Sequence, residues 1–321
     1  MNPMNLAPRR IIFALFPGCE MLDLAGPAQA FYEAKVLGVP YEISYCAPTP
    51  EVPSAQGLRL SGLEALPQVR PGDLIILPGY PTHTMPVPAR LVAWLRDVHR
   101  AGVELCSVCT GAFALGEAGA LDGKTCTTHW KRVSELKARY PRAQVVGNRL
   151  FVIDDGIVTS AGIAAGIDMA LALIERDAGP LVAGEVAREM VVYIRRDGAH
   201  DQESVYLDYQ THLSPGIHQL QQHLVSNPGS RETLGQLARI AGMSERNLTR
   251  VFKRATGISI HDYRERLRVE RARDLMKNPM MTLDAVAAAC GFADGRQLRR
   301  VWAARFGAPP SASRVNFRPA P

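Results

Sequence analysis

The chain has 321 residues, with 37 Lys and Arg against 31 Asp and Glu and a formal net charge of +6. This length favours two domains. No apolar run approaches the roughly twenty residues that cross a membrane, and the run IIFALF (11–16) is too short for a signal peptide. The sequence therefore predicts a cytoplasmic protein with no membrane partner.

The six cysteines give no metal signature. Cys106 and Cys109 are two residues apart, but no second pair accompanies them as a zinc site would require. We expect reduced thiols, no bound metal and no cofactor.

The first two thirds of the chain alternate apolar strands with amphipathic helices. We expect strands at 11–16, 41–47, 73–79 and 104–109, and helices at 25–38 and 88–102. This alternation favours an α/β fold with a doubly wound parallel sheet. Ligands of such sheets bind at the carboxyl ends of strands, where Gly79 and Cys109 lie.

The segment around Cys109 resembles a nucleophile elbow. ELCSVC ends a predicted strand, a Thr-Gly turn follows, and AFALGEAGAL begins a helix whose amino end would lower the pKa of the thiol. His129 follows a short apolar stretch and is a candidate base for that nucleophile. Ser107 stands where a tight elbow has glycine. The alternative is a buried structural cysteine.

Residues 197–216 are polar, carry two glycines and a proline, and lack the strong periodicity of the residues before them. We predict a first domain over 1–197, a linker over 198–214, and an all-α domain over 215–321 that opens with a helix at 218–229. Residues 215–321 carry 18 Lys and Arg against 8 Asp and Glu, whereas residues 1–214 are net acidic. A basic segment of this kind is typical of a phosphate-binding surface.

The last domain contains one helical unit twice. Residues 233–264 and 282–314 align with one extra residue in the second copy, so that Gly242 pairs with Gly291 and Leu248 with Leu298. In each copy a short helix ends at the glycine, and a second helix follows. Two helix-turn-helix units are predicted, at about 234–255 and 283–306, with Ser244 as the cap of the second helix in the first copy.

The polar face of each second helix carries the candidate DNA contacts. Leu248, Val251 and Phe252 would share the buried face of the first copy, and Leu298, Val301 and Trp302 that of the second. Arginine suits guanine, and asparagine or glutamine suits adenine. The candidate DNA-binding residues are Arg246, Asn247, Thr249, Arg250, Lys253, Arg296, Gln297, Arg299 and Arg300.

Residues 215–321 resemble the DNA-binding domain of the AraC/XylS family. The resemblance includes the closing pattern G-x-x-P-x-x-x-R, here Gly307, Pro310 and Arg314. It implies one chain whose two recognition helices enter successive major grooves of promoter DNA. Two positions depart from the family pattern: Gly295 weakens the start of the second recognition helix, and Ser313 replaces an aromatic residue. We expect the first copy to distinguish bases more strictly and the second to contact mainly phosphates.

Residues 11–197 resemble the PfpI-like branch of the class I glutamine amidotransferase superfamily, and more narrowly the GlxA-type regulators. The matching stretches are residues 16–31, 74–79, 106–130 and 158–174. The resemblance implies Cys109 as the elbow cysteine, His129 as its partner, Asp23 beside it, and backbone amides near Gly79 and Tyr80 as oxyanion donors. The residues expected to border one ligand cavity are Asp23, Gly79, Tyr80, Cys109, Thr110, His129, Trp130 and Gly162.

Three functions fit these features. The first domain could bind a small nitrogen-containing effector and control a transcription regulator, it could be a working cysteine hydrolase or amidase, or it could only dimerise the chain. The fused DNA-binding domain favours the first, because ligand binding then has a readout, and Cys109, His129 and Asp23 become vestigial. The resemblance also implies a homodimer and contact with RNA polymerase.

Overall fold

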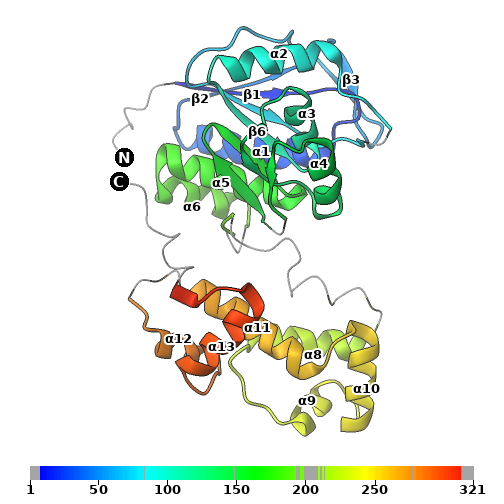
Figure 1. Ribbon diagram of the computed structural model, residues 1–321, viewed down its shortest axis with the longest axis vertical. Coiled ribbons are helices and arrows are strands. Elements are labelled where there is room, and N and C mark those ends of the chain that lie inside the picture. Colours follow the sequence, from blue (N-terminus) through cyan, green and yellow to red (C-terminus); the bar gives the residue numbers. More distant parts are fainter. Residues whose placement is uncertain are drawn as a thin grey trace. The chain divides into compact units, whose positions relative to one another are not determined.

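The computed structural model describes residues 8–311 except 83, 148, 193–195, 199–208, 210–211, 213, 277 and 279. Arg314 and Ser313 of the closing pattern therefore lie outside the described residues, as does most of the predicted linker. The chain forms two compact units, residues 1–202 and residues 203–321, and each is described by itself (Figure 1).

The first unit is built on a six-stranded sheet in the order β2-β1-β5-β6-β10-β9. Every neighbouring pair is parallel except β10 and β9, which are antiparallel at one edge. The predicted parallel sheet is confirmed, and the antiparallel edge strand was not foreseen. The strands of this sheet are β1 (Arg9–Ala14), β2 (Tyr41–Cys46), β5 (Leu74–Leu77), β6 (Glu104–Val108), β9 (Phe151–Asp154) and β10 (Ile157–Ser160).

Helices cover both faces of this sheet. Successive strand residues point to opposite faces, so Ile11 and Phe13 belong to one core and Ile12 and Ala14 to the other. The first face is covered by α1 (Met21–Val36), α5 (Ile163–Ala178) and α6 (Pro180–Glu189); the second by α2 (Ala89–Arg100), α3 (Gly111–Glu117) and α4 (Val133–Arg139) (Figure 1). This is the doubly wound arrangement that the sequence predicted.

Helix α1 begins four residues before its predicted start at residue 25. The sequence AGP suggested a helix start, but Pro27 lies inside the helix and is buried. Gly26 explains why the segment stays tightly packed, since a β-carbon there would lie 2.8 Å from Ile167 Cγ1 of α5. Close contact between these two helices holds the start of α1, and with it Asp23, against the sheet.

Short elements outside the main sheet were not predicted, because segments of two or three residues show no periodicity. They are β3 (Glu51–Pro53) paired with β4 (Arg59–Ser61), β7 (Thr125–Cys126) paired with β8 (Gln144–Val145), and the 3-10 turn η1 (Trp130–Arg132).

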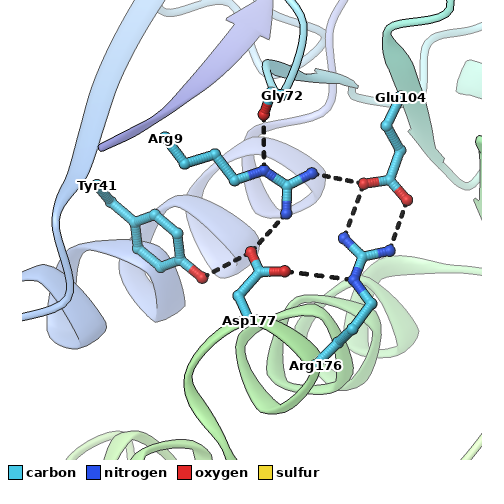
Figure 2. A network of polar contacts seen from close by, with 6 residues as sticks. All are labelled: Arg9, Tyr41, Gly72, Glu104, Arg176 and Asp177. Atoms are coloured by element: carbon cyan, nitrogen blue, oxygen red, sulfur yellow. Dashed lines mark hydrogen bonds and ion pairs between the residues drawn. The ribbon is translucent and has the colours of Figure 1, made fainter. Parts of the chain in front are cut away.

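The amino ends of the strands carry an ion-pair network, shown in Figure 2. Glu104 accepts two hydrogen bonds from Arg176, at 2.7 and 2.8 Å, and one from Arg9 at 2.6 Å. Arg9 also contacts Asp177, which accepts a 3.0 Å hydrogen bond from the Tyr41 hydroxyl. Burial acts to raise the pKa of Glu104, but the two guanidinium groups outweigh it and lower that pKa. The network fastens the end of α5 to the edge of the sheet that is remote from Cys109.

The second unit has two small cores connected by a helix. Its described helices are α8 (Pro215–Ser226), α9 (Leu234–Ile240), α10 (Glu245–Thr256), α11 (Ile260–Leu275), α12 (Leu283–Ala289) and α13 (Gly295–Phe306). Tyr263 and Leu267 of α11 belong to the first core, and Ala272 and Met276 belong to the second. Both predicted helix-turn-helix units are present, and Gly242 and Gly291 take left-handed conformations at their turns.

Both recognition helices are capped by side chains. Ser244 accepts a 3.4 Å hydrogen bond from the amide of Asn247 at the start of α10, and Asp294 accepts a 2.8 Å hydrogen bond from the amide of Gln297 at the start of α13. The expectation that Gly295 weakens the second start was wrong, because Asp284 of α12 also accepts a 2.9 Å hydrogen bond from the Gly295 amide.

Glycine at position 295 makes room for this contact. A β-carbon on Gly295 would lie 2.5 Å from Asp284 Oδ1. The first copy has a close approach of a similar kind with the partners exchanged: Gly235 of α9 faces Glu245 of α10, whose Oε1 would lie 2.7 Å from a β-carbon on the glycine. Each copy thus pairs one acidic residue with one glycine between its two helices, from opposite sides.

Candidate ligand pocket and nucleic-acid interface

Cys109 occupies a strained turn between β6 and α3. Its φ is +56°, a left-handed value that costs roughly 1–2 kcal/mol for a residue with a β-carbon. Its amide donates a 2.9 Å hydrogen bond to the Ser160 carbonyl, which holds the turn against β10. The elbow forms although Ser107, not glycine, lies two residues earlier. Cys109 is also the one partly exposed thiol among the six, whereas the other five are buried.

Three side chains converge on Gly79. A β-carbon there would lie 2.4 Å from Asp23 Oδ2, 2.9 Å from Thr110 Oγ1 and 3.0 Å from Cys109 Cβ. The four residues come from α1, from the segment after β5 and from the turn after β6, so they meet at the carboxyl edge of the sheet. The structure thus brings together Asp23, Gly79, Cys109 and Thr110 as expected, and only glycine fits at their centre.

The two expected oxyanion donors are already engaged. The Gly79 amide donates to Asp23 Oδ2 at 3.0 Å, and the Tyr80 amide donates to Thr110 Oγ1 at 2.7 Å. Thr110 also donates from Oγ1 to the Tyr80 carbonyl at 2.7 Å. The Tyr80 ring itself packs edge-on against Phe16 in the core. Neighbouring side chains therefore accept hydrogen bonds from both amides that the resemblance implies as oxyanion donors.

The thiol of Cys109 is held in its protonated form. Burial and the nearby charge of Asp23 raise the pKa of Cys109 to about 12. Burial likewise raises the pKa of Asp23 to about 7, against the hydrogen bond from Gly79. The expectation of a lowered thiol pKa was wrong: α3 is short, and burial beside an acid outweighs its amino end. Near neutral pH the pair is a neutral thiol and a half-ionised carboxyl group.

His129 has partners other than the thiol. Its Nδ1 accepts a hydrogen bond from the Lys131 amide at 3.3 Å, its ring stacks on Trp130, and it borders Gly162. Within the described part of the chain no hydrogen bond joins His129 to Cys109. Burial, followed by Lys131 and Arg132, lowers the pKa of His129. The Cys–His pair inferred from sequence is therefore absent from this geometry, and Asp23 is the acid–base group beside the thiol.

Trp130 is half exposed, with 49% of its surface open to solvent. The Nζ atom of Lys131 lies 5.0 Å from the centroid of its ring. This indole therefore already holds a cation, supplied by the chain itself. The core-packing alternative for Trp130 is contradicted by its exposure.

Two neighbours of Cys109 were missed in the sequence. Thr128 donates from Oγ1 to the Cys109 carbonyl at 2.8 Å, and the charge of Glu20 acts on both Cys109 and Asp23. Thr128 directly precedes His129, and Glu20 lies three residues before Asp23, so proximity in the chain was the available signal. Across the described residues no cluster of His, Cys, Asp and Glu could hold a metal ion, and no helix there is long and apolar enough to span a bilayer.

The predicted recognition residues lie on the surface of the second unit. Arg246, Thr249, Arg250 and Lys253 of α10 are exposed, and with Arg254 they line one shallow hollow. Arg296, Arg299 and Arg300 of α13 are exposed as well. Leu248 and Phe252 are fully buried, as are Leu298 and Trp302. The predicted division into a buried and an outward face is confirmed.

The two amide side chains of these helices have local partners. Asn247 Oδ1 accepts a 2.9 Å hydrogen bond from Arg250, and Gln297 Oε1 accepts a 2.7 Å hydrogen bond from the Ala293 amide. Both residues are half-buried. Asn247 therefore orients a guanidinium group, and Gln297 closes the start of α13.

Two family models cover the chain in succession. Residues 9–176 match the DJ-1/PfpI family, and residues 237–316 match a helix-turn-helix domain. The chain belongs to the DJ-1/PfpI family. It is 30% identical over 319 residues to the HTH-type transcriptional regulator GbdR of Pseudomonas aeruginosa, which covers 97% of this chain and 86% of that protein. The predicted PfpI-like domain joined to a DNA-binding domain is thus confirmed, and the chain is a DNA-binding transcription regulator.

Two further comparisons concern the first unit. Isonitrile hydratase of Pseudomonas putida is 32% identical over 172 residues, covering 53% of this chain and 72% of the enzyme. The crystal structure of an AraC family transcriptional regulator from Pseudomonas putida superposes with a TM-score of 0.52 at 23% identity, covering 57% of this chain and all of that one. The chain is thus similar in sequence to a named enzyme and similar in fold to a named regulator.

Proposed function

We propose that this transcription regulator senses a small nitrogen-containing metabolite at the Cys109 elbow. The observation that carries the proposal is that Asp23 and Thr110 occupy the Gly79 and Tyr80 amides. A hydrolase needs preorganised donors aimed at the developing oxyanion, whereas a binding pocket does not. The site keeps a partly exposed thiol beside an acid, which suits recognition more than turnover.

The charges around the Cys109 elbow support an amine or ammonium ligand. Asp23 Oδ2 accepts from the Gly79 amide and the Cys109 thiol lies within hydrogen-bond reach of the carboxyl group, which leaves the buried Oδ1 as the acceptor for a ligand N–H. Glu20 adds negative charge close by. Trp130 offers an aromatic face that already attracts the cation of Lys131. An amino acid, an amine or a quaternary ammonium compound fits these groups.

A thermal-shift screen of the full chain with such metabolites tests the sensor. A ligand should raise the unfolding temperature of the wild type, and Asp23→Asn should reduce that shift. Leu181→Ala, at an exposed position on α6, should leave the shift unchanged. If no member of these classes stabilises the wild type, the sensor proposal fails, and the DNA-binding function stands.

We also propose that the regulator acts as a homodimer in the cytoplasm and contacts RNA polymerase at its promoter. The exposed outer face of α1 supports the dimer: Tyr32 and Val36 are 53% and 62% exposed. Beside them lies a hollow of about 720 Å³ between α1, β2 and the β3–β4 pair. Val36→Glu should yield monomers in analytical ultracentrifugation, whereas Leu181→Glu, at an exposed apolar position on α6, should not.

A cysteine-dependent hydrolase or hydratase is the second candidate. The strained, partly exposed Cys109 beside Asp23 favours it, as does the likeness to isonitrile hydratase. In that chemistry the Cys109 sulfur would add to an electrophilic carbon of the substrate while Asp23 carries the thiol proton to the substrate. Water would then displace the sulfur from that carbon and regenerate the thiol. Cys109→Ala separates the two functions: a variant that still responds to its inducer in a reporter strain has no need of covalent catalysis.

A further inference from the structure

The second unit has a cleft of about 480 Å³ between its two helix-turn-helix units. Arg231, just before α9, forms one side, and Gly291 and Gln297 of the second copy form the other. The first helix of such a unit crosses the DNA backbone, and the amino end of the recognition helix contacts bases. The cleft therefore adjoins the DNA-facing parts of both copies.

The floor of the cleft is positively charged. Arg264 of α11 donates a 2.9 Å hydrogen bond to the Glu232 carbonyl, and Arg268 donates to the carbonyls of Pro228 and Ser230 at 3.1 and 2.7 Å. Carbonyl oxygens orient a guanidinium group but do not neutralise it. Burial and the charges of Arg264 and Arg231 lower the pKa of Arg268, which indicates mutual repulsion.

The neighbouring acids only partly balance this charge. Glu232, beside the cleft, lies 3.6 Å from Arg264 but is shared with His223, and Glu265 is the carboxylate that lines the cleft. At the rim, His261 is exposed. Three guanidinium groups thus face two carboxylates, whereas Arg9 and Arg176 in the first unit are matched by Glu104 and Asp177.

Residues 228–232, whose carbonyls accept hydrogen bonds from Arg264 and Arg268, hold the cleft in shape. Gly229 of this segment packs on the turn of the second copy, since a β-carbon on Gly291 would lie 2.5 Å from the Gly229 carbonyl oxygen. Arg264 and Arg268 hold this segment, and the segment in turn contacts the second copy. Both sides of the cleft are therefore fixed in place. A preorganised cationic cleft loses little entropy on binding an anion.

We propose that this cleft binds a backbone phosphate of the DNA segment between the two recognition sites, with Arg231 as the direct contact. Arg264 and Arg268 supply the positive floor. This contact carries no sequence information but fixes the register of both recognition helices on the duplex. It rests on the DNA-binding function and is independent of the proposed effector.

The test uses full-length protein and a duplex that it selects from a random pool. Arg231→Ala should weaken binding to selected and scrambled duplexes by the same factor. The slope of log affinity against log salt should become shallower by about 1. Arg305→Ala, which removes an exposed arginine near the end of α13, is the matched control and should leave the salt slope unchanged.

A second arm locates the phosphate. Methylphosphonate linkages placed one at a time between the two protected stretches should weaken binding of the wild type at one or two positions, and Arg231→Ala should be insensitive at those positions. Equal salt slopes for Arg231→Ala and wild type would overturn the proposal. Stabilisation of the wild type alone by inorganic phosphate, with an unchanged salt slope, would assign the cleft to a free anion and also overturn it.

Discussion

Asp23 Oδ2 accepts a hydrogen bond from the Gly79 amide at 3.0 Å, across 56 residues of chain, and this contact sets the chemistry of the Cys109 elbow. It occupies a donor that a hydrolase would direct at its substrate. It also holds a carboxyl group beside the thiol, where burial and like charge disfavour ionisation of both groups.

The first prediction concerns the reactivity of Cys109. Because its pKa is raised to about 12, alkylation by iodoacetamide at pH 8 should be at least about a hundredfold slower than that of a free cysteine, whose pKa is about 8.5. Mass spectrometry of labelled peptides across a pH series measures the rate, with Cys109→Ser to verify the site. A labelling midpoint below pH 8 would contradict the assigned protonation state.

The second prediction concerns the pH dependence that Asp23 produces. A carboxyl group whose folded pKa is raised contributes stability that is present below its unfolded pKa of about 3.9 and is lost as pH rises through the folded value of about 7. Asp23→Asn should therefore gain stability relative to wild type between pH 4 and 8, by at most about 4 kcal/mol. Urea unfolding of the first unit at several pH values, followed by the fluorescence of Trp94 and Trp130, measures this. A constant difference across that range would refute it.

The third prediction concerns the network at the opposite edge of the sheet. Glu104→Gln removes a carboxylate that binds Arg9 and Arg176, and should lower the stability of the first unit by about 2 kcal/mol at neutral pH. The lowered pKa of Glu104 gives stability above its unfolded pKa that is lost as pH falls through the folded one. The two proteins should therefore converge in strong acid. Glu189→Gln, at an exposed end of α6, is the control and should match the wild type throughout.

The fourth prediction concerns Gly295. A β-carbon there meets Asp284 Oδ1 at 2.5 Å, so Gly295→Ala should displace the acid from the start of α13 and cost about 1 kcal/mol. Amide hydrogen exchange in α13 should accelerate about fivefold. Gly235→Ala in the first copy is the comparison: it meets only the flexible end of exposed Glu245 and should accelerate exchange in α10 less. Equal effects in the two copies would mean that Asp284 does not hold the helix start.

The fifth prediction distinguishes the recognition helices. Arg250→Ala should weaken binding to the selected duplex by about 1–3 kcal/mol and relax the sequence preference at one position. Arg300→Ala should weaken binding to all sequences and make the salt slope shallower by about 1. Repeating the selection from a random pool with each variant measures both effects. Unchanged binding by both variants across a salt series would show that these faces are not the recognition faces.

The strands and recognition helices were predictable because long apolar patterns determine them. The strand predicted at IIFALF overlaps β1, with each end displaced by two residues. The two predicted helix-turn-helix units match α9–α10 and α12–α13 closely. The start of α1 was missed, because Gly26 and Pro27 normally begin a helix and only the packing of α5 shows otherwise. The strands β3, β4, β7 and β8 are too short for any periodicity.

The sequence predicted which residues lie together at the Cys109 elbow, but not which hydrogen bonds they make. The resemblance placed Asp23, Cys109 and Gly79 together, and the structure does the same. Which donors remain open depends on contacts 30 to 56 residues apart, such as that between Thr110 and the Tyr80 amide, and no local pattern encodes them. The place of His129 after a short strand likewise said nothing of the direction of its ring.

The exchanged acid–glycine pairs have a consequence for the history of the repeat. If a stretch of one copy overwrote half of the other by gene conversion, the product would place Glu245 opposite Asp284, or glycine opposite glycine. The first hybrid would set two carboxylates against each other, and the second would lose the contact. Each duplicate is thus a matched set that only transfer of the whole unit would preserve.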